Sequence, residues 1–545
     1  MKNIKIRTYF TAVLGLTIFF SSCVDLEEEL FSDITADDFF RTEEEFISAL
    51  GEAYRSLGGI GNHSSLWTIN ELSSDAFVIG TKGGDWFDGG VPLQVHQHEF
   101  QVDNEFFNNA WGFVYGGINN CNRLIFSFQN SDNPNSTAFI AELRALRALF
   151  YFWGMDAFGN IPLVTDFTRV DPPINSSRQE VYNFILSELN ETIPLLPTAK
   201  DGTTYGRMTK WSALMIRMKL YLNAEVYTGT PQWSLAKADA EEIILDGPYS
   251  IEPVYSDNFL INNSGSSENI FIYPYDKVFA IGFNWVMMGL HIGSQFTYNL
   301  TQQPWNGYQT VQEFYNSYVV PELNPGTQGM VWKDLALEQS QGTIDGRLSN
   351  FLVGPQFRDN GTRLEDPGVE PFDATGRTGD PDGPPITFMP FINEAWPNSL
   401  RQSGARIGKY EIERGGTDNM SNDFVIFRLA DTILSLAEAK YRMGQTAEAL
   451  ELVNQIRERA GNLDPFSLLD DEKLLAERGR EMYGEMTRRQ DLIRFGKFGA
   501  AWWPFQGMNR PKRVHQPGSH LEIFPIPQLQ LIANERLEQN PGYPR

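Results

Sequence analysis

Apolar residues recur three and four positions apart over long stretches in the first half of this chain and near its C-terminus. This spacing is typical of helices that bury one face. The longest stretch, 137–158, ends at Gly159, and Pro162 prevents its continuation. Similar stretches occur at 42–57, 103–128, 178–195, 210–227, 234–246, 428–443, 446–459 and 470–483. The sequence therefore predicts an all-α fold.

Residues 248–416 differ in composition: short apolar runs alternate with Gly, Pro, Asn and Asp. Within them, 358–385 is particularly rich in these residues and predicts a long loop. We expect a helical N-terminal part at about 28–247, a loop-rich insertion with several aromatic residues at about 248–416, and a helical C-terminal part at about 417–545.

Two of the predicted helices are joined by Gly444 and form a helical hairpin at 430–460. Small and large apolar residues alternate along it, as in degenerate tetratricopeptide repeats, although no clean period runs through the chain. Hairpins of this kind stack into scaffolds. We therefore expect a tetratricopeptide-like scaffold with irregular insertions.

Charge and cysteine content exclude several classes of protein. The chain has 545 residues, with 44 Lys and Arg against 69 Asp and Glu, and a formal charge of −25. The electric field of this net negative charge repels the phosphate backbone of nucleic acid, so we do not expect nucleic acid to bind. The two cysteines, Cys23 and Cys121, cannot form a disulfide framework, and we expect Cys121 to be a buried free thiol.

Residues 1–22 have the features of a signal peptide: basic residues, then the apolar stretch 9–20. Phe20-Ser21-Ser22-Cys23 resembles a bacterial lipoprotein box, which makes Cys23 the predicted lipidation site; ordinary cleavage is the alternative. The acidic segment 25–29 resembles the surface-export signal of Bacteroidetes lipoproteins. We expect 23–545 to be a mature protein on the outer surface of the outer membrane, held there only by its N-terminal lipid.

Five segments carry a resemblance to a known family, and they occur in the family's order. They are Ala145–Trp153 with Phe158–Val164, Arg428–Asp431 with Ala437–Ala439, Glu477–Glu481, Arg489–Gly496, and Pro525–Tyr543. The chain resembles SusD/RagB-like outer-membrane lipoproteins over nearly all of its mature length. This resemblance implies four tetratricopeptide-like units and the binding of a glycan without catalysis. It also implies a SusC-like TonB-dependent transporter as partner.

A narrower resemblance involves the segments 71–75, 81–90 and 404–410. Family members with similar segments, often with Arg where Lys82 stands, include laminarin- and levan-type glycan binders. In those members a tryptophan of the loop stacks on sugar. The resemblance makes a β-1,3-glucan such as laminarin our first expected ligand and levan our second.

Tryptophan offers a flat apolar face to a sugar ring, and polar side chains bind its hydroxyl groups. Trp86 lies between glycines and acids in a predicted loop, and we expect it to stack on sugar. Trp285 and Trp332 are further candidates, and Trp305 is a weaker one. Each of these rings could instead be buried packing.

Asp75, Asp85 and Asp88 flank Trp86 in sequence and could accept hydrogen bonds from sugar hydroxyls, whereas Arg406 could donate them. Each of the four could instead have a structural role, the aspartates in turns and the arginine in an ion pair. We expect Asp431 and Asp491 to be helix caps or ion-pair residues, and Trp153 and Trp211 to be packing.

Motifs for catalysis or for cofactors are weak in this sequence. His96 and His98 would share one face of a strand at 93–102, but no third ligand stands at a recognisable spacing, so we expect neither a metal nor a cofactor. We expect no enzymatic activity. A surface glycoside hydrolase, or a transporter lid that captures peptide, are the alternative classes.

Overall fold

The computed structural model describes residues 42–82, 85–129, 131, 135–318, 345–366, 385–461, 463–501 and 513–545. The signal peptide, Cys23 and Trp332 lie outside these residues.

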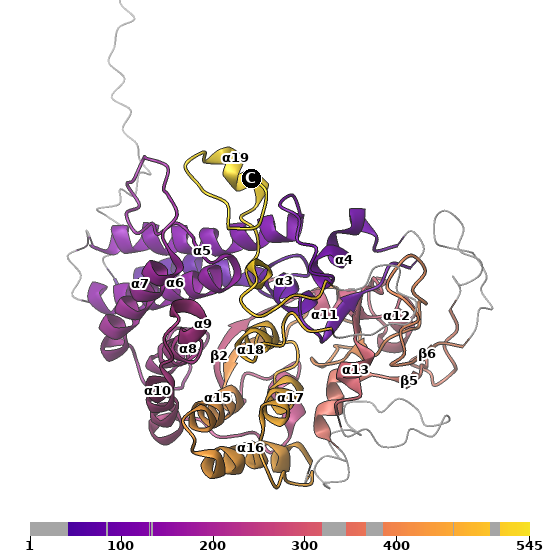
Figure 1. Cartoon of the computed structure of the whole chain (residues 1–545). Helices are drawn as coiled ribbons and strands as arrows, with labels where there is room; N and C mark the ends of the chain where they lie inside the picture. Colours follow the sequence, from indigo (N-terminus) through magenta and orange to yellow (C-terminus); the bar gives the residue numbers. More distant parts are fainter. Residues whose placement is uncertain are drawn as a thin grey trace, which may run out of the picture.

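Most of the N-terminal part consists of helices packed on their chain neighbours (Figure 1). They are α2 (Glu43–Arg55), α5 (Glu105–Gln129), α6 (Ser136–Phe158), α7 (Arg178–Thr192), α8 (Lys210–Leu222) and α10 (Trp233–Asp246). The helix α6 is buried over nearly its whole length, because α5, α7 and α2 all pack on it. Capping boxes begin α2, at Thr42 and Glu45, and α7, at Ser177 and Glu180.

The C-terminal part adds a second set of helices. They are α15 (Leu429–Arg442), α16 (Thr446–Gly461), α17 (Asp471–Glu481) and α18 (Arg488–Arg494). The helix α15 packs against α10 and α16, so the two helical parts form one continuous scaffold (Figure 1). The prediction of a helical scaffold with a loop-rich insertion is confirmed.

The remaining helices and strands are short. The helices are α3 (Leu66–Leu72), α4 (Val91–His96), α9 (Ala224–Thr228), α11 (Trp285–Gly289), α12 (Ser294–Tyr298), α13 (Gln312–Tyr315) and α19 (Gln528–Ala533). The strands form antiparallel pairs: β1 (Phe77–Ile79) with β3 (Tyr308–Thr310), β2 (Asn269–Pro274) with β8 (Asp423–Arg428), β4 (Phe351–Leu352) with β7 (Arg406–Ile407), and β5 (Gly354–Pro355) with β6 (Thr387–Phe388).

A strand at 93–102, which would place His96 and His98 on one face, is not present, because α4 extends to His96. Gly90, in a left-handed conformation, and Pro92 at the first turn start a helix there. His96 therefore lies at the end of α4, where its Nδ1 is 3.3 Å from the carbonyl oxygen of Leu72. His98 lies beyond the helix, so the two rings do not share a strand face.

Buried ion pairs join the C-terminal helices to the rest of the fold. Asp431 pairs with Lys219 of α8 and with Arg478 of α17, at 2.7 and 3.2 Å. Asp491 pairs with Arg478 and Arg494, at 2.9 and 2.7 Å. The prediction that these two acids serve as ion-pair residues is confirmed.

Packing roles predicted for other residues also hold. Trp153 and Trp211 are buried, and so is the free thiol of Cys121. Burial raises the pKa of the Cys121 thiol to about 12. Within the described residues, no helix is both long and apolar enough to cross a bilayer.

Candidate functional site

Three segments meet on the loop-rich side of the molecule: 81–82 with 85–90 before α4, 301–307 before β3, and 389–401. The backbone N–H of Thr81 donates to the carbonyl of Ala395 at 2.7 Å, and that of Ser399 donates to the carbonyl of Thr81 at 2.8 Å. The side chain of Asn306 donates to the carbonyl of Arg401 at 3.2 Å. We call these three segments the aromatic loop cluster.

Trp86 holds the first two segments of the cluster together. Its indole Nε1 donates a hydrogen bond to the carbonyl of Trp305, and its ring packs on the backbone of Gly307. A Cβ atom at Gly307 would lie 2.5 Å from the ring, so only glycine fits this close approach. The ring is therefore half-buried, and the expected solvent-facing platform is present only in part.

The backbone around Trp86 is strained. Trp86 has a φ of 60° and Asp88 a φ of 43°, in the left-handed region that bulky side chains rarely adopt. Strained residues persist only where the surrounding structure holds them, and they concentrate at functional sites. The contacts of Trp86 with Trp305 and Gly307 supply that support.

Polar groups surround the Trp86 ring. Asp85 and Asp88 are exposed, and burial together with the charge of Asp85 raises the pKa of Asp88. The ring of His63 meets Trp86 edge-on, with 6.4 Å between the ring centroids. Burial lowers the pKa of His63, and its Nδ1 has no hydrogen-bond partner among the described residues. A neutral imidazole in this place can exchange hydrogen bonds with hydroxyl groups.

Further aromatic side chains lie on the same three segments. Phe87 is 38% exposed, Phe391 is exposed, and Trp305 and Trp396 are half-buried. Sequence reasoning missed His63, Phe87, Phe391 and Trp396 as binding candidates. The signal available in the sequence was the occurrence of aromatic residues in segments without helical or strand periodicity.

Trp285 is not available to a ligand, and the expectation that it contacts sugar is wrong. It starts α11 and is fully buried, with its ring stacked on Trp67 at a centroid distance of 4.1 Å. The ring of Tyr410 meets its edge at 6.1 Å. Trp285 is thus core packing, because aromatic rings occupy its surroundings inside the fold.

Arg406 is also buried, so the expectation of direct sugar contact is wrong for this residue too. It lies on β7 and donates to the carbonyls of Ser403 and Arg401 and to Oδ1 of Asn306, at 2.6, 2.5 and 2.8 Å. Burial and the nearby charge of Arg401 lower the pKa of Arg406 to about 9. Arg406 therefore connects two segments of the aromatic loop cluster, through its hydrogen bonds to Asn306 and Arg401.

Asp75 lies outside the cluster. Both of its carboxylate oxygens accept hydrogen bonds from Arg488 of α18, each at 2.7 Å. This bidentate pair ties the start of β1 to the C-terminal helices. The expected contact between Asp75 and sugar is therefore replaced by a structural one.

The site combines aromatic faces with carboxylates and an imidazole. It is suited to binding a ligand that has both apolar faces and hydroxyl groups. Within the described residues, no group of three or more His, Cys, Asp and Glu is placed to hold a metal ion. The fold and this site define a helical scaffold whose candidate ligand contacts come from loops.

Two family models and several relatives match this chain. The model described as "SusD family" matches residues 391–543, and the model described as "Starch-binding associating with outer membrane" matches residues 90–279. The starch-binding protein SusD of Bacteroides thetaiotaomicron is 26% identical over 442 residues, which cover 74% of this chain and 72% of SusD. In both regions the chain is therefore similar to SusD/RagB-like proteins.

Solved structures share the fold. A laminarin-binding SusD-like protein superposes with a TM-score of 0.65 at 22% identity, covering 92% of this chain and all of the other. Surface glycan-binding protein A from Bacteroides thetaiotaomicron, in complex with laminarihexaose, superposes with a TM-score of 0.64 at 20% identity, covering 91% and 99%. The family consists of non-catalytic glycan-binding proteins associated with the outer membrane, and this chain is a binding protein, not an enzyme.

Proposed function

We propose that this protein binds a polysaccharide at the cell surface through its aromatic loop cluster and delivers it to a SusC-like TonB-dependent transporter. The observation that carries the proposal is the Trp86 loop, whose aromatic residues are held by contacts to two other segments. Cys23 is the proposed lipid attachment site on the outer membrane.

A β-1,3-glucan such as laminarin is the proposed ligand, with levan second. The resemblance of segment 81–90 to laminarin- and levan-type binders supports this choice. The fold is shared with a protein described as laminarin-binding and with another solved in complex with laminarihexaose. The proposed contact residues are Trp86, Phe87, Asp85 and Asp88 of the cluster, together with the neighbouring His63.

Calorimetric titration of residues 24–545 against laminarin, levan, starch, mannan, xylan and alginate tests this proposal. We expect dissociation constants of about micromolar to millimolar for one glycan, because a shallow platform leaves sugars partly solvated. Trp86→Ala should weaken binding at least tenfold. The matched control is Trp233→Ala, which removes another half-buried tryptophan, at the start of α10.

Circular dichroism and thermal unfolding would accompany each titration. Since Trp86 is half-buried, Phe87→Ala is the second variant, whose more exposed ring can be removed with little effect on folding. If both folded variants bind the glycan as tightly as the wild type, the aromatic loop cluster is not the binding site. A crosslinking mass-spectrometry experiment with the co-expressed transporter would test delivery separately.

A further inference from the structure

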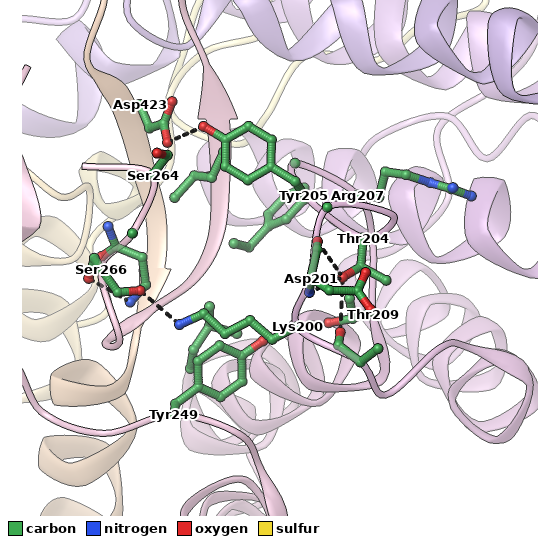
Figure 2. A pocket seen from close by; sticks show the side chains of 18 of the residues that line it. Lys200, Asp201, Thr204, Tyr205, Arg207, Thr209, Tyr249, Ser264, Ser266 and Asp423 are labelled. Carbon is green, nitrogen blue, oxygen red and sulfur yellow. Dashed lines mark hydrogen bonds between the residues drawn. The ribbon is translucent and has the colours of Figure 1, made fainter. Parts of the chain in front are cut away.

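A cavity lies away from the aromatic loop cluster, between the segment 199–209 before α8 and the segment 263–272, which includes the start of β2. Its volume is about 520 Å³, within the range of about 300–1,000 Å³ that is usual for small-molecule sites. None of the three segments of the aromatic loop cluster lines it. Figure 2 shows Tyr205 and Tyr249 on opposite sides of the opening.

Hydrogen bonds hold the two walls of this cavity in place. Lys200 extends from one wall to the other and donates to the carbonyls of Ser266 and Ser267, at 2.8 and 3.0 Å (Figure 2). Its ammonium group also lies 4.6 Å from the ring centroid of Tyr249. Burial lowers the pKa of Lys200 to about 8. The segment 199–209 is thus tied to the segment opposite.

Tyr205 presents an open ring at the edge of the cavity. Its side chain is 42% exposed, and its hydroxyl donates a hydrogen bond to Oδ2 of Asp423 on β8 (Figure 2). Burial raises the pKa of Asp423 to about 6. The hydroxyl is therefore anchored while part of the ring stays open to solvent, which is the arrangement that stacking on a sugar ring requires.

The cavity wall also contains an unsatisfied polar group. Asn269 is only 7% exposed, and its Oδ1 accepts no hydrogen bond from any described residue. A buried polar atom without a partner costs about 1–3 kcal/mol, and a ligand or water that reaches it removes this cost. Its side chain lines the same cavity as the rings of Tyr205 and Tyr249.

Charges around the cavity are mixed in sign. The lining residues include Lys200 and Arg207 as well as Asp201 and Asp423, and Arg207 is paired with Glu142 at 2.6 Å. No charge of one sign dominates, so the cavity does not select for an anion or a cation. Two aromatic rings among hydroxyl, amide and carboxylate groups match the chemistry of a neutral saccharide.

We propose that this cavity, which we call the Tyr205 pocket, is a second saccharide site that binds a short neutral oligosaccharide or the end of a glycan chain. This site is independent of the aromatic loop cluster, because the two share no residue. A glycan bound at both sites would gain avidity from the second contact.

Saturation-transfer NMR and calorimetry with laminaritriose, maltotriose and xylotriose test the proposal. The measurements are made on residues 24–545 carrying Trp86→Ala and Phe87→Ala, so that the aromatic loop cluster does not contribute. We expect at least one trisaccharide to bind this protein. Adding Tyr205→Ala should lower its affinity at least fivefold, and Tyr205→Phe, which keeps the ring, should lower it less.

The matched control is Phe126→Ala in the same background, because Phe126 on α5 is 43% exposed and lies outside the pocket. The proposal would be overturned if trisaccharide binding disappeared with the Trp86 and Phe87 substitutions, or if Tyr205→Ala left the affinity unchanged. It would also be overturned if none of the three trisaccharides bound. The proposed function fails on a different result, namely polysaccharide binding that is insensitive to Trp86→Ala and Phe87→Ala.

Discussion

The indole nitrogen of Trp86 donates a hydrogen bond to the backbone carbonyl of Trp305, which connects two loops more than two hundred residues apart in the chain. The same ring rests on Gly307. Trp86 is therefore both a candidate ligand contact and a structural support for its neighbours. Substitutions in this region need to separate these two roles.

Phe87→Ala should separate them, because this ring is more exposed than that of Trp86. An aromatic contact contributes about 0.5–1.5 kcal/mol beyond the area that it buries. We expect the affinity for the bound polysaccharide to fall roughly three- to tenfold, with the unfolding temperature nearly unchanged. Titration calorimetry and thermal unfolding measure the two effects. An unchanged affinity would remove Phe87 from the site.

Trp285→Ala should have the opposite effect, lowering stability and leaving glycan binding unchanged. The ring is fully buried and stacks on Trp67, so its removal leaves a large cavity in the core. Truncation of a buried aromatic residue costs about 3–5 kcal/mol. We expect urea unfolding to show this loss, while the protein that remains folded binds glycan normally. A loss of binding without a loss of stability would contradict the assignment of Trp285 to the core.

Arg406→Lys should loosen the aromatic loop cluster. Lysine keeps the charge but cannot reach both carbonyls and Asn306 with the geometry of a guanidinium group. Leaving a buried acceptor unpaired costs about 1–3 kcal/mol. We expect faster hydrogen exchange at 301–307 and 389–405, with exchange in α6 unchanged. Arg169→Lys, on the exposed surface, is the control, and equal exchange in both variants would show that Arg406 does not support the loops.

Acid should destabilise the protein through the buried carboxylates of α17. The pKa values of Glu477 and Glu481 are both lowered from 4.5 to about 2 by nearby guanidinium groups. Those near Glu477 belong to Arg347, Arg480 and Arg457. Those near Glu481 belong to Arg459, Arg428 and Arg347. These acids bind protons more tightly in the unfolded chain. Their contribution to stability is therefore complete above pH 4.5 and is lost as the pH falls toward 2.

Urea unfolding at pH 7, 4 and 3 measures this effect. Glu481→Gln should cost about 3–5 kcal/mol at pH 7, because it leaves Arg428 and Arg459 with less compensation for their buried charge. Between pH 4 and 3 its stability should fall less steeply than that of the wild type. Parallel curves for the two proteins would contradict the assignment.

Glu71 should have the reverse pH dependence. It is fully buried, burial raises its pKa from 4.5 to about 8, and its Oε1 accepts a hydrogen bond from the backbone N–H of Met486. The folded protein binds this proton more tightly than the unfolded chain does. The stabilisation is complete below pH 4.5 and is lost as the pH rises through 8.

Glu71→Gln keeps the acceptor for Met486 and removes the ionisation. Ionisation of Glu71 should lower the free energy of unfolding by up to about 1.4 kcal/mol for each pH unit between pH 5 and 8. Glu71→Gln should lack this pH-dependent loss. Urea unfolding across this range measures the difference. Glu44→Gln, at an exposed position in the first turn of α2, is the control and should leave the slope unchanged.

Helices were the most predictable part of the fold. The expected range 137–158 corresponds to Ser136–Phe158, and 446–459 to Thr446–Gly461, because the apolar spacing and the residues that end a helix are both local. The condition for a shared face of His96 and His98, a strand at 93–102, is not met. The few apolar residues of this segment do not distinguish a strand from a helix, and the start at Gly90 and Pro92 decided for the helix.

Candidate site residues were less predictable, because sequence could indicate which side chains bind sugar but not which of them reach the surface. Trp86 and Trp285 both occur in segments without clear periodicity, yet one is half-buried in a loop and the other is stacked on Trp67. Asp75 and Arg406 are polar residues with buried partners far along the chain. Exposure depends on what packs against a residue, and those partners come from distant segments.

The sequence by itself determined the helical scaffold and the resemblance to SusD/RagB-like proteins, because periodicity, helix-ending residues and motif order are properties of neighbouring residues. Only the tertiary structure decided that Trp86, Phe87, Trp305 and His63 lie together, that Trp285 and Arg406 are buried, and that Tyr205 and Tyr249 border a second cavity. The physical reason is that these arrangements depend on long-range packing and on hydrogen bonds between loops, which no local pattern encodes.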